Sequence, residues 1–337
     1  MTRTSVPPSS WRTSAPRPPP TPRAAQSFLR EFLSDRRIVE THPLRWRPVL
    51  EGIILRVRPR ASAAKYATIW RPGEETSRSG SPLMHYGERQ GELLQQELGE
   101  SVQVRIAMRY GQPALRRVMG ELMEAGCRRI ALIPLYPQYA ASSAGTVVDE
   151  AARFILASRN QPELRTIRSF ETASAYIEAL ATALEQHWQI HGRPDPAAGE
   201  RLLLSFHSIP QAMHDAGDPY RCECERTAQL LSRRLDLPDG LAQLTFQSVF
   251  GPAAWIGPAT IDTVEELGRA GCPRLDVICP GFVSDCLETL EEINQLNRET
   301  FTTAGGGSFH YVPWGNDSDG AIAALAQQAR KVLSGWI

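Results

Sequence analysis

The sequence predicts an α/β fold of two similar doubly wound domains, each built around a parallel sheet. From Thr21 onward, short β-rich runs alternate with helical periods of roughly 10–16 residues, which is the pattern of βαβ units. Two such series follow one another and meet near residues 165–175. The 337 residues, 42% of them apolar, are enough to fill two buried cores.

The first series opens with apolar residues at helical spacing over 28–33. The segments that follow are a strand at 102–107, a helix at 115–123, a strand at 129–135, a helix at 144–156 and a strand at 164–167. Each strand is a short run of apolar and β-branched residues, and each helix repeats its apolar residues with a period near 3.6.

The second series repeats this alternation. Its helices are expected at 173–188, 223–235, 261–270, 284–297 and near 321–333, and its strands at 202–206, 244–248, 275–279 and 309–312. The crossovers between parallel strands are expected to be right-handed. Because open α/β sheets bind ligands at the carboxyl ends of their strands, those ends are the expected site.

Composition excludes several classes of protein. The 37 basic and 37 acidic residues cancel, whereas a nucleic-acid-binding protein normally carries a basic excess. No apolar run approaches the roughly 20 residues that a membrane-spanning helix needs, so we expect at most peripheral contact with a membrane. Six cysteines are too few for a disulfide scaffold in a chain of this length, and they indicate reduced thiols and a cytoplasmic protein.

A histidine stands at the end of the strand predicted over 202–206. His207 is followed by Ser208, Ile209 and Pro210, and the proline fixes the turn. This position is where ligands bind in open α/β sheets. A lone histidine is more often a hydrogen-bonded structural residue, so the motif alone assigns no function.

Three acidic residues follow the strand predicted at 275–279. If the next helix begins at Ser284 or Asp285, then Asp285, Glu288 and Glu292 lie on one helix face. The simplest interpretation is a solvated acidic face whose first acids stabilise the helix dipole. A carboxylate near a histidine can also hold a divalent metal or accept protons.

Aromatic and cationic residues end two strands of the first series. Arg109 and Tyr110 follow the strand at 102–107, and Tyr136 follows the strand at 129–135. Rings, an arginine and nearby hydroxyl groups suit a flat, partly apolar ligand that carries carboxylates, although turn formation or core packing would explain each motif equally well. The sequence has no C-x-x-C pair and no glycine-rich phosphate loop, so zinc and nucleotide sites have little support.

Eight segments, taken in order, carry a family resemblance. They are FLREFLSDRRIVE (28–40), GSPL (80–83), MRYGQP (108–113), PLYPQYAASSAGT (134–146), LLLSFHSIP (202–210), GDPY (217–220), TFQSVFGPAAWIGPAT (245–260) and CPGFVSDCLETLEEI (279–293). Together they resemble the ferrochelatases, which insert ferrous iron into protoporphyrin at the end of haem synthesis. The segments FLSDRR and DCLETLEEI are most similar to the corresponding segments of the proteobacterial members.

The resemblance implies two chelatase-type domains with four-stranded parallel sheets and a porphyrin in the cleft between them. His207 matches the family's essential histidine and Glu288 its essential glutamate, which implies that they bind the metal or take the pyrrole protons. Which residue does which stays open. Asp285 and Glu292 match an acidic row that leads away from Glu288, as a path for metal or protons.

Four further residues match positions that line the porphyrin cleft in the family: Arg109, Tyr110, Tyr136 and Trp255. This set suits the substrate, because a porphyrin is planar and apolar with propionates at its rim. Its two N–H protons must leave as Fe²⁺ enters, and imidazole and carboxylate together can accept protons while holding the ion loosely. Family enzymes also bend the macrocycle, which converts binding energy into strain.

The implied partners are protoporphyrin IX and ferrous iron, so iron is a substrate and no tightly bound cofactor is expected. An iron–sulfur cluster is not expected, because the chain lacks the C-terminal cysteine extension of relatives that have one. A monomer and a homodimer both fit the sequence. Two alternatives stay open: a non-catalytic porphyrin-binding or haem-binding remnant, and a sister chelatase that acts on coproporphyrin or inserts cobalt.

The first 22 residues depart from the family pattern. They hold seven prolines and no acidic residue, so they are expected to form a disordered tail, and the proline run argues against the amphipathic helix of a transit peptide. The domains are then expected at 23–170 and 171–337, with the C-terminal helix able to pack back on the first domain.

Family members have a strand reading roughly Leu-Leu-Val-Asn-Leu-Gly-Thr-Pro before the FLREFLSDRR helix. Residues 9–16 read SSWRTSAP instead and cannot form a buried strand, so the first strand of the first domain is expected to be missing or altered. If the serines use TCN codons, a reading frame shifted by two bases permits Leu-Leu-Ala-Asn-Leu-Gly-Thr. We therefore hypothesise a frameshift upstream of about residue 17–21, in the gene or in its sequencing.

Overall fold

The computed structural model describes residues 21–71 and 80–337. The predictions for the N-terminal segment, a disordered tail or a shifted reading frame, concern residues 1–20 and lie outside the described residues. No helix of the described chain is both long and apolar enough to cross a membrane.

The larger sheet is the one that the second series predicts. Its four parallel strands are β3 (Arg201–His207), β4 (Ala242–Gln247), β5 (Arg274–Ile278) and β6 (Ser308–Val312), in the order β4-β3-β5-β6. On β3, Leu202 is in register with Ala242 on one side and Asp276 on the other. β3 and β5 are buried along nearly their whole length, because helices cover both faces of a parallel sheet.

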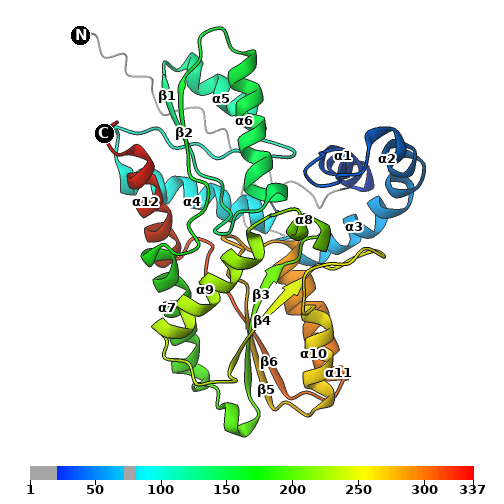
Figure 1. The fold of residues 1–337 in the computed structure, drawn as a ribbon. Coiled ribbons are helices and arrows are strands. Elements are labelled where there is room, and N and C mark those ends of the chain that lie inside the picture. The colour runs from blue at the N-terminus through cyan, green and yellow to red at the C-terminus, as the bar shows by residue number, and fades with distance from the viewer. Residues whose placement is uncertain (1–20, 72–79) are drawn as a thin grey trace.

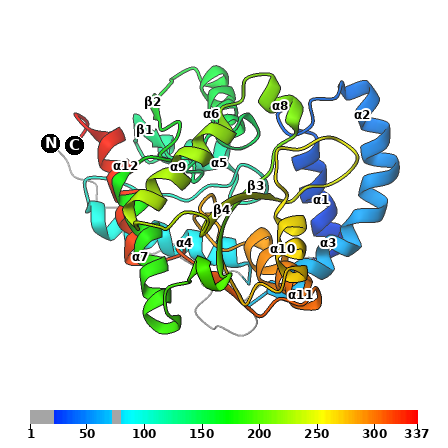
Figure 2. The ribbon, with the colours of Figure 1, turned by 60° about the horizontal axis from the view of Figure 1, so that its bottom comes forward.

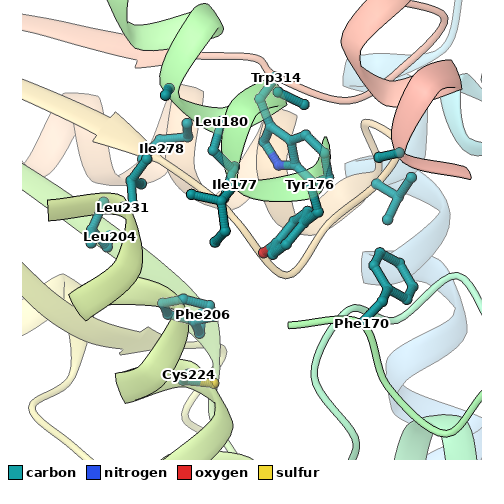
Figure 3. Packing of buried hydrophobic residues seen from close by; sticks show 14 of the residues in the cluster. Phe170, Tyr176, Ile177, Leu180, Leu204, Phe206, Cys224, Leu231, Ile278 and Trp314 are labelled. Atoms are coloured by element: carbon teal, nitrogen blue, oxygen red, sulfur yellow. The ribbon is translucent and has the colours of Figure 1, made fainter. Parts of the chain in front are cut away.

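Helices cover this sheet in two layers (Figure 1). One layer contains α7 (Ser174–His191), α9 (Tyr220–Arg234) and α12 (Asp319–Leu333), and the other contains α10 (Thr260–Arg269) and α11 (Arg298–Thr303). Alternate residues of β3 face the two layers: Leu204 and Phe206 join the core with α7 and α9, and Leu203 joins the core with α10 and α11. Figure 3 shows Leu204 beside Leu231 of α9 in the first of these cores.

The first domain has a smaller sheet than predicted. Within the described residues it contains two parallel strands, β1 (Arg129–Leu132) and β2 (Glu163–Thr166), packed with α5 (Leu115–Glu124) and α6 (Thr146–Ala157). The prediction of a strand at 102–107 is wrong, because these residues form no strand in the structure. An isolated bridge follows them, between Met108 and Ala114. A strand needs a neighbour for its ladder hydrogen bonds, and no described segment offers one to residues 103–107.

A helical arm stands beside the larger sheet, as Figure 2 shows. It consists of α1 (Pro22–Leu33), α2 (Pro43–Val49), the π-helix η1 (Leu50–Ile54) and α3 (Leu55–Ile69). Only α1 is predicted by the sequence pattern. The arm has its own small core around Leu33, Leu50 and Leu55.

The remaining helices connect these parts. They are α4 (Pro82–Leu98), the π-helix η2 (Ala141–Gly145), η3 (Pro196–Ala198), α8 (Gln211–Asp215) and the π-helix η4 (Glu288–Asn297). The C-terminal helix α12 packs on α7 and also contacts α4 and β1. Arg165 of β2 donates to the carbonyls of Val332 and Ser334, which holds the end of α12 beside the first sheet.

Candidate active site at the strand ends

His207 is the last residue of β3 and is partly buried. Its Nδ1 lies 2.5 Å from the carbonyl oxygen of Ser208, and its ring centroid is 6.5 Å from that of Phe282. A carbonyl oxygen can only accept a hydrogen bond, so Nδ1 carries the proton in this contact. In the tautomer that this contact favours, Nε2 keeps the lone pair with which histidine binds a metal or takes a proton.

The helix after β5 begins later than predicted, and Asp285 is not part of it. The helical residues start at Leu287, and η4 opens at Glu288. Asp285 instead accepts hydrogen bonds from Tyr311 Oη at 2.6 Å, Asn316 Nδ2 at 2.7 Å and Thr289 Oγ1 at 2.8 Å. These bonds hold the turn before the helix, so the predicted helix start at Ser284 or Asp285 is wrong, whereas the acidic path through Asp285 stays a prediction.

Glu292 is joined to the end of β4. Ser248 donates its backbone N–H to Glu292 Oε1 at 2.6 Å and its hydroxyl to Oε2 at 2.5 Å. Ser248 has φ of 65°, a left-handed conformation that is uncommon outside glycine and that directs both donors to one carboxylate. Gln247 also donates to the backbone carbonyl of Glu288, at 2.8 Å.

The pKa of Glu292 is raised above its ordinary value. Burial is the main cause, and the charge of Glu288 adds to it. The two hydrogen bonds from Ser248 and the nearby His207 lower the pKa but only partly offset the burial. A carboxylate of this kind accepts a proton more readily than an exposed glutamate does.

Glu288 lies near two tyrosine hydroxyls and one cysteine thiol. Burial, followed by the charge of Glu288, raises the pKa of Tyr66 on α3, of Tyr136 after β1 and of Cys286 before the helix. The same carboxylate therefore lies near side chains from three separate parts of the chain. Tyr66 is absent from the sequence prediction, because no motif marks it and the helix that carries it is not predicted.

Arg109 and Tyr110 are engaged with an aspartate of the arm. The Arg109 guanidinium forms an ion pair with Asp35 and donates to the Thr146 carbonyl at 2.9 Å, while Tyr110 Oη donates to Asp35 at 2.9 Å. The Arg109 side chain is 11% exposed, and Glu150 lies 3.8 Å away. These contacts fasten α1 to the first domain, so much of the arginine's hydrogen-bonding capacity is already in use.

Trp255 lies on the loop between β4 and α10, close to the residues that follow His207. Trp255 forms an isolated antiparallel bridge with Pro210, and its indole donates to the Phe250 carbonyl at 2.9 Å. The Arg58 guanidinium of α3 lies 5.2 Å from the centre of the Phe250 ring. The loop thus connects the arm to the end of β3.

The structure therefore gathers His207, Glu288 and Glu292 at the carboxyl ends of the larger sheet, with Tyr136 contributed by the smaller one. Asp285 lies in the turn before η4. Cys279 and Cys286 are buried, and burial raises the pKa of both thiols. The charges of Asp285 and Glu292 also raise the pKa of the Cys279 thiol. Imidazole, carboxylates and aromatic rings at one sheet edge can receive protons beside a flat ligand.

A model of the ferrochelatase family matches residues 18–333. The chain belongs to the ferrochelatase family. Among its curated relatives are the ferrochelatases of Dechloromonas aromatica, 48% identical over 320 residues, and Aromatoleum aromaticum, 49% identical over 322. A third, from Chromobacterium violaceum, is 46% identical, and each alignment covers 94% of this chain and 85% of the relative.

Solved structures support the fold of this ferrochelatase. SirB from Bacillus subtilis with Fe³⁺ matches with a TM-score of 0.53 at 15% identity, over 75% of this chain and 91% of SirB. The sirohydrochlorin chelatase SirB from the subspecies spizizenii, in complex with cobalt, gives a TM-score of 0.50 at 13% identity, over 74% of this chain and 90% of that one. Likeness at such identity shows a shared chelatase fold.

Proposed function

We propose that this ferrochelatase inserts ferrous iron into protoporphyrin IX to form protohaem, the last step of haem synthesis. The observation that carries the proposal is the gathering of His207, Glu288 and Glu292 at one end of the larger sheet in a chain of this family. Insertion replaces two pyrrole N–H bonds by bonds to Fe²⁺ and releases two protons. The site must therefore contain proton acceptors and a loose ligand for the incoming ion.

In this proposal, His207 and Glu288 face the porphyrin and share the work of holding Fe²⁺ and taking the pyrrole protons. The hydrogen bond of Nδ1 to the Ser208 carbonyl supports this role for His207, because it leaves Nε2 with its lone pair. Glu292, with its raised pKa, is the next proton acceptor beyond Glu288. Tyr136 and Trp255 contribute rings to the walls of the porphyrin site.

The direct test compares His207→Ala and Glu288→Gln with the parent in two assays, metal insertion and porphyrin binding. We expect insertion to fall by about 10²–10⁴-fold in each variant, because each removes a proton acceptor from the reacting centre. Porphyrin binding should stay within a few-fold of the parent. Insertion at the parental rate by His207→Ala would overturn the assignment, and His214→Ala is the matched histidine control.

We also propose that the arm rests on a membrane surface. Its outer side exposes Ile53 and Val57, which are 58% and 69% accessible, and Phe250 of the adjacent loop is 50% accessible. The same arm carries exposed arginines, at positions 45, 47, 56, 58 and 60. Apolar side chains together with cations suit the boundary of a membrane with anionic lipids.

Co-sedimentation with vesicles that contain anionic phospholipid tests the arm. Ile53→Asp with Val57→Asp should reduce the bound fraction, whereas Leu156→Asp, at a site 82% exposed on α6, should not. Equal binding by all three proteins would contradict the proposal.

We place the protein in the cytoplasm, because all six cysteines are free thiols, and we expect a colourless protein without an iron–sulfur cluster.

A further inference from the structure

A second cluster of metal-ligating side chains lies far from His207. It contains His187 and His191 of α7, Asp276 of β5 and His310 of β6. Asp276 is in register with His310 on the neighbouring strand and with Leu202 of β3. Leu202 precedes His207 by five residues, so the cluster is about 16 Å from the strand ends along β3.

The distances within the cluster are close to those between the ligand atoms of a bound metal ion. His187 Nε2 is 3.4 Å from Asp276 Oδ1, and His310 Nδ1 is 3.0 Å from the same oxygen. These three atoms lie within 4.8 Å of one another. A tetrahedral ion bound at about 2.0–2.1 Å separates its ligand atoms by about 3.3 Å, so little side-chain movement is needed to admit one.

His187 Nε2 is close to Asp276 but is not hydrogen-bonded to it. It is buried, and within the described chain it makes no hydrogen bond. Burial lowers the pKa of His187 and outweighs the opposing effect of Asp276, and the two neighbouring histidines lower it further.

The Asp276 carboxylate is held in place by further hydrogen bonds to both of its oxygens. Arg274 donates to Oδ1 at 2.9 Å and to Oδ2 at 2.7 Å, and the Trp188 indole donates to Oδ2 at 3.0 Å. Arg274 is itself fixed by the carbonyls of His191 and Gly192 at the end of α7. Such outer hydrogen bonds orient a ligating carboxylate in metal sites.

A hydrogen-bond network alone accounts for Asp276 and Arg274 but leaves two facts unexplained. It provides no well-formed hydrogen bond for the buried Nε2 of His187, whose near neighbour Asp276 Oδ1 is 3.4 Å away. It also gives no reason to gather three imidazoles, with the His191 ring centroid 4.5 Å from those of both His187 and His310. A cation shared by His187 and His310 accounts for the first fact and for the approach of two of the three rings.

We propose that His187, Asp276 and His310 form a second cation site, distinct from the strand-end site. Two imidazole nitrogens and one carboxylate favour a divalent transition metal such as Zn²⁺, Co²⁺ or Fe²⁺ over Mg²⁺ or Ca²⁺, which prefer oxygen ligands. His310 binds through Nδ1 as the tautomer protonated on Nε2. The ion connects α7, β5 and β6, so its binding stabilises the second domain.

Co²⁺ titration of the full chain tests the site, because four-coordinate Co²⁺ gives intense visible absorption. The titration is made in a His207→Ala, Glu288→Gln background, which removes the strand-end ligands. We expect one equivalent of Co²⁺ to bind, and the further change His187→Gln to weaken binding at least tenfold. The matched control is His214→Gln, because His214 also has a buried ring nitrogen without a hydrogen bond in the described chain but lies outside the cluster.

A second variant guards against failure to fold. His310→Gln changes a side chain that is 25% exposed on the edge strand β6, and circular dichroism checks that the protein is folded. Zn²⁺ should raise the Tm of the background protein and not that of His310→Gln. The proposal is overturned if the background protein binds no Co²⁺, or if His310→Gln binds it as tightly as the background.

Discussion

Glu292 combines burial with two short hydrogen bonds from Ser248, and its pKa is raised because burial dominates. The pKa in the folded chain thus lies above that in the unfolded chain, and the folded state binds this proton more tightly. The resulting stabilisation is complete below the unfolded value, about 4.3 for glutamate, and is lost as the pH rises through the folded pKa.

Glu292→Gln removes this titration. We expect the free energy of unfolding of the variant to fall less than that of the parent as the pH rises from about 4 towards neutrality. Urea unfolding at a series of pH values measures the difference, with the exposed Glu299→Gln as the matched control. Parallel curves for parent and Glu292→Gln would show that Glu292 does not titrate differently in the folded protein.

At the scale of residues, local sequence predicts which side chains end a strand but not what binds them. His207 lies at the end of β3 as predicted, since an apolar run followed by a proline turn is a local signal. The position of Asp285 depends on Tyr311 and Asn316, which are 26 and 31 residues away along the chain. Tyr66 reaches Glu288 only because the arm folds against η4, which no local pattern indicates.

At the scale of elements, the strands of the larger sheet are predictable because β3 and β5 are short, mostly apolar runs buried on both faces. The helices α2 and α3 are not, because Pro48 and Pro59 lie inside them and interior prolines argue against helix. The strand expected at 102–107 has suitable residues but no described neighbour for its ladder. Local pattern predicts a strand's composition, whereas pairing depends on a second segment.

The frameshift hypothesis makes a prediction about that segment. A chain with the shifted frame restored gains the Leu-Leu-Ala-Asn-Leu-Gly-Thr strand, which can pair with residues 103–107 and protect their amides. We expect slower hydrogen exchange at 103–107 in the restored chain than in the 337-residue chain, and equal exchange within β3. Equal exchange at 103–107 in both chains would argue against this role of the missing strand.

At the scale of the molecule, the two-series pattern predicts two parallel sheets, and the structure has both, with four strands in one and two described strands in the other. The family match covers residues 18–333, a range that contains His207 and Glu288. The catalytic roles of these two residues stay predictions. The arm and the loop with Trp255 lie beside the strand ends through tertiary contacts, which sequence periodicity cannot predict.

The most direct measurement is zinc insertion into protoporphyrin IX, followed by fluorescence, with the 337-residue chain and the frame-restored chain side by side. We predict that the restored chain inserts zinc, that the 337-residue chain is slower or inactive, and that His207→Ala abolishes insertion in the restored chain. If neither chain inserts zinc while both bind porphyrin, the protein is a porphyrin-binding remnant and the proposed activity is contradicted.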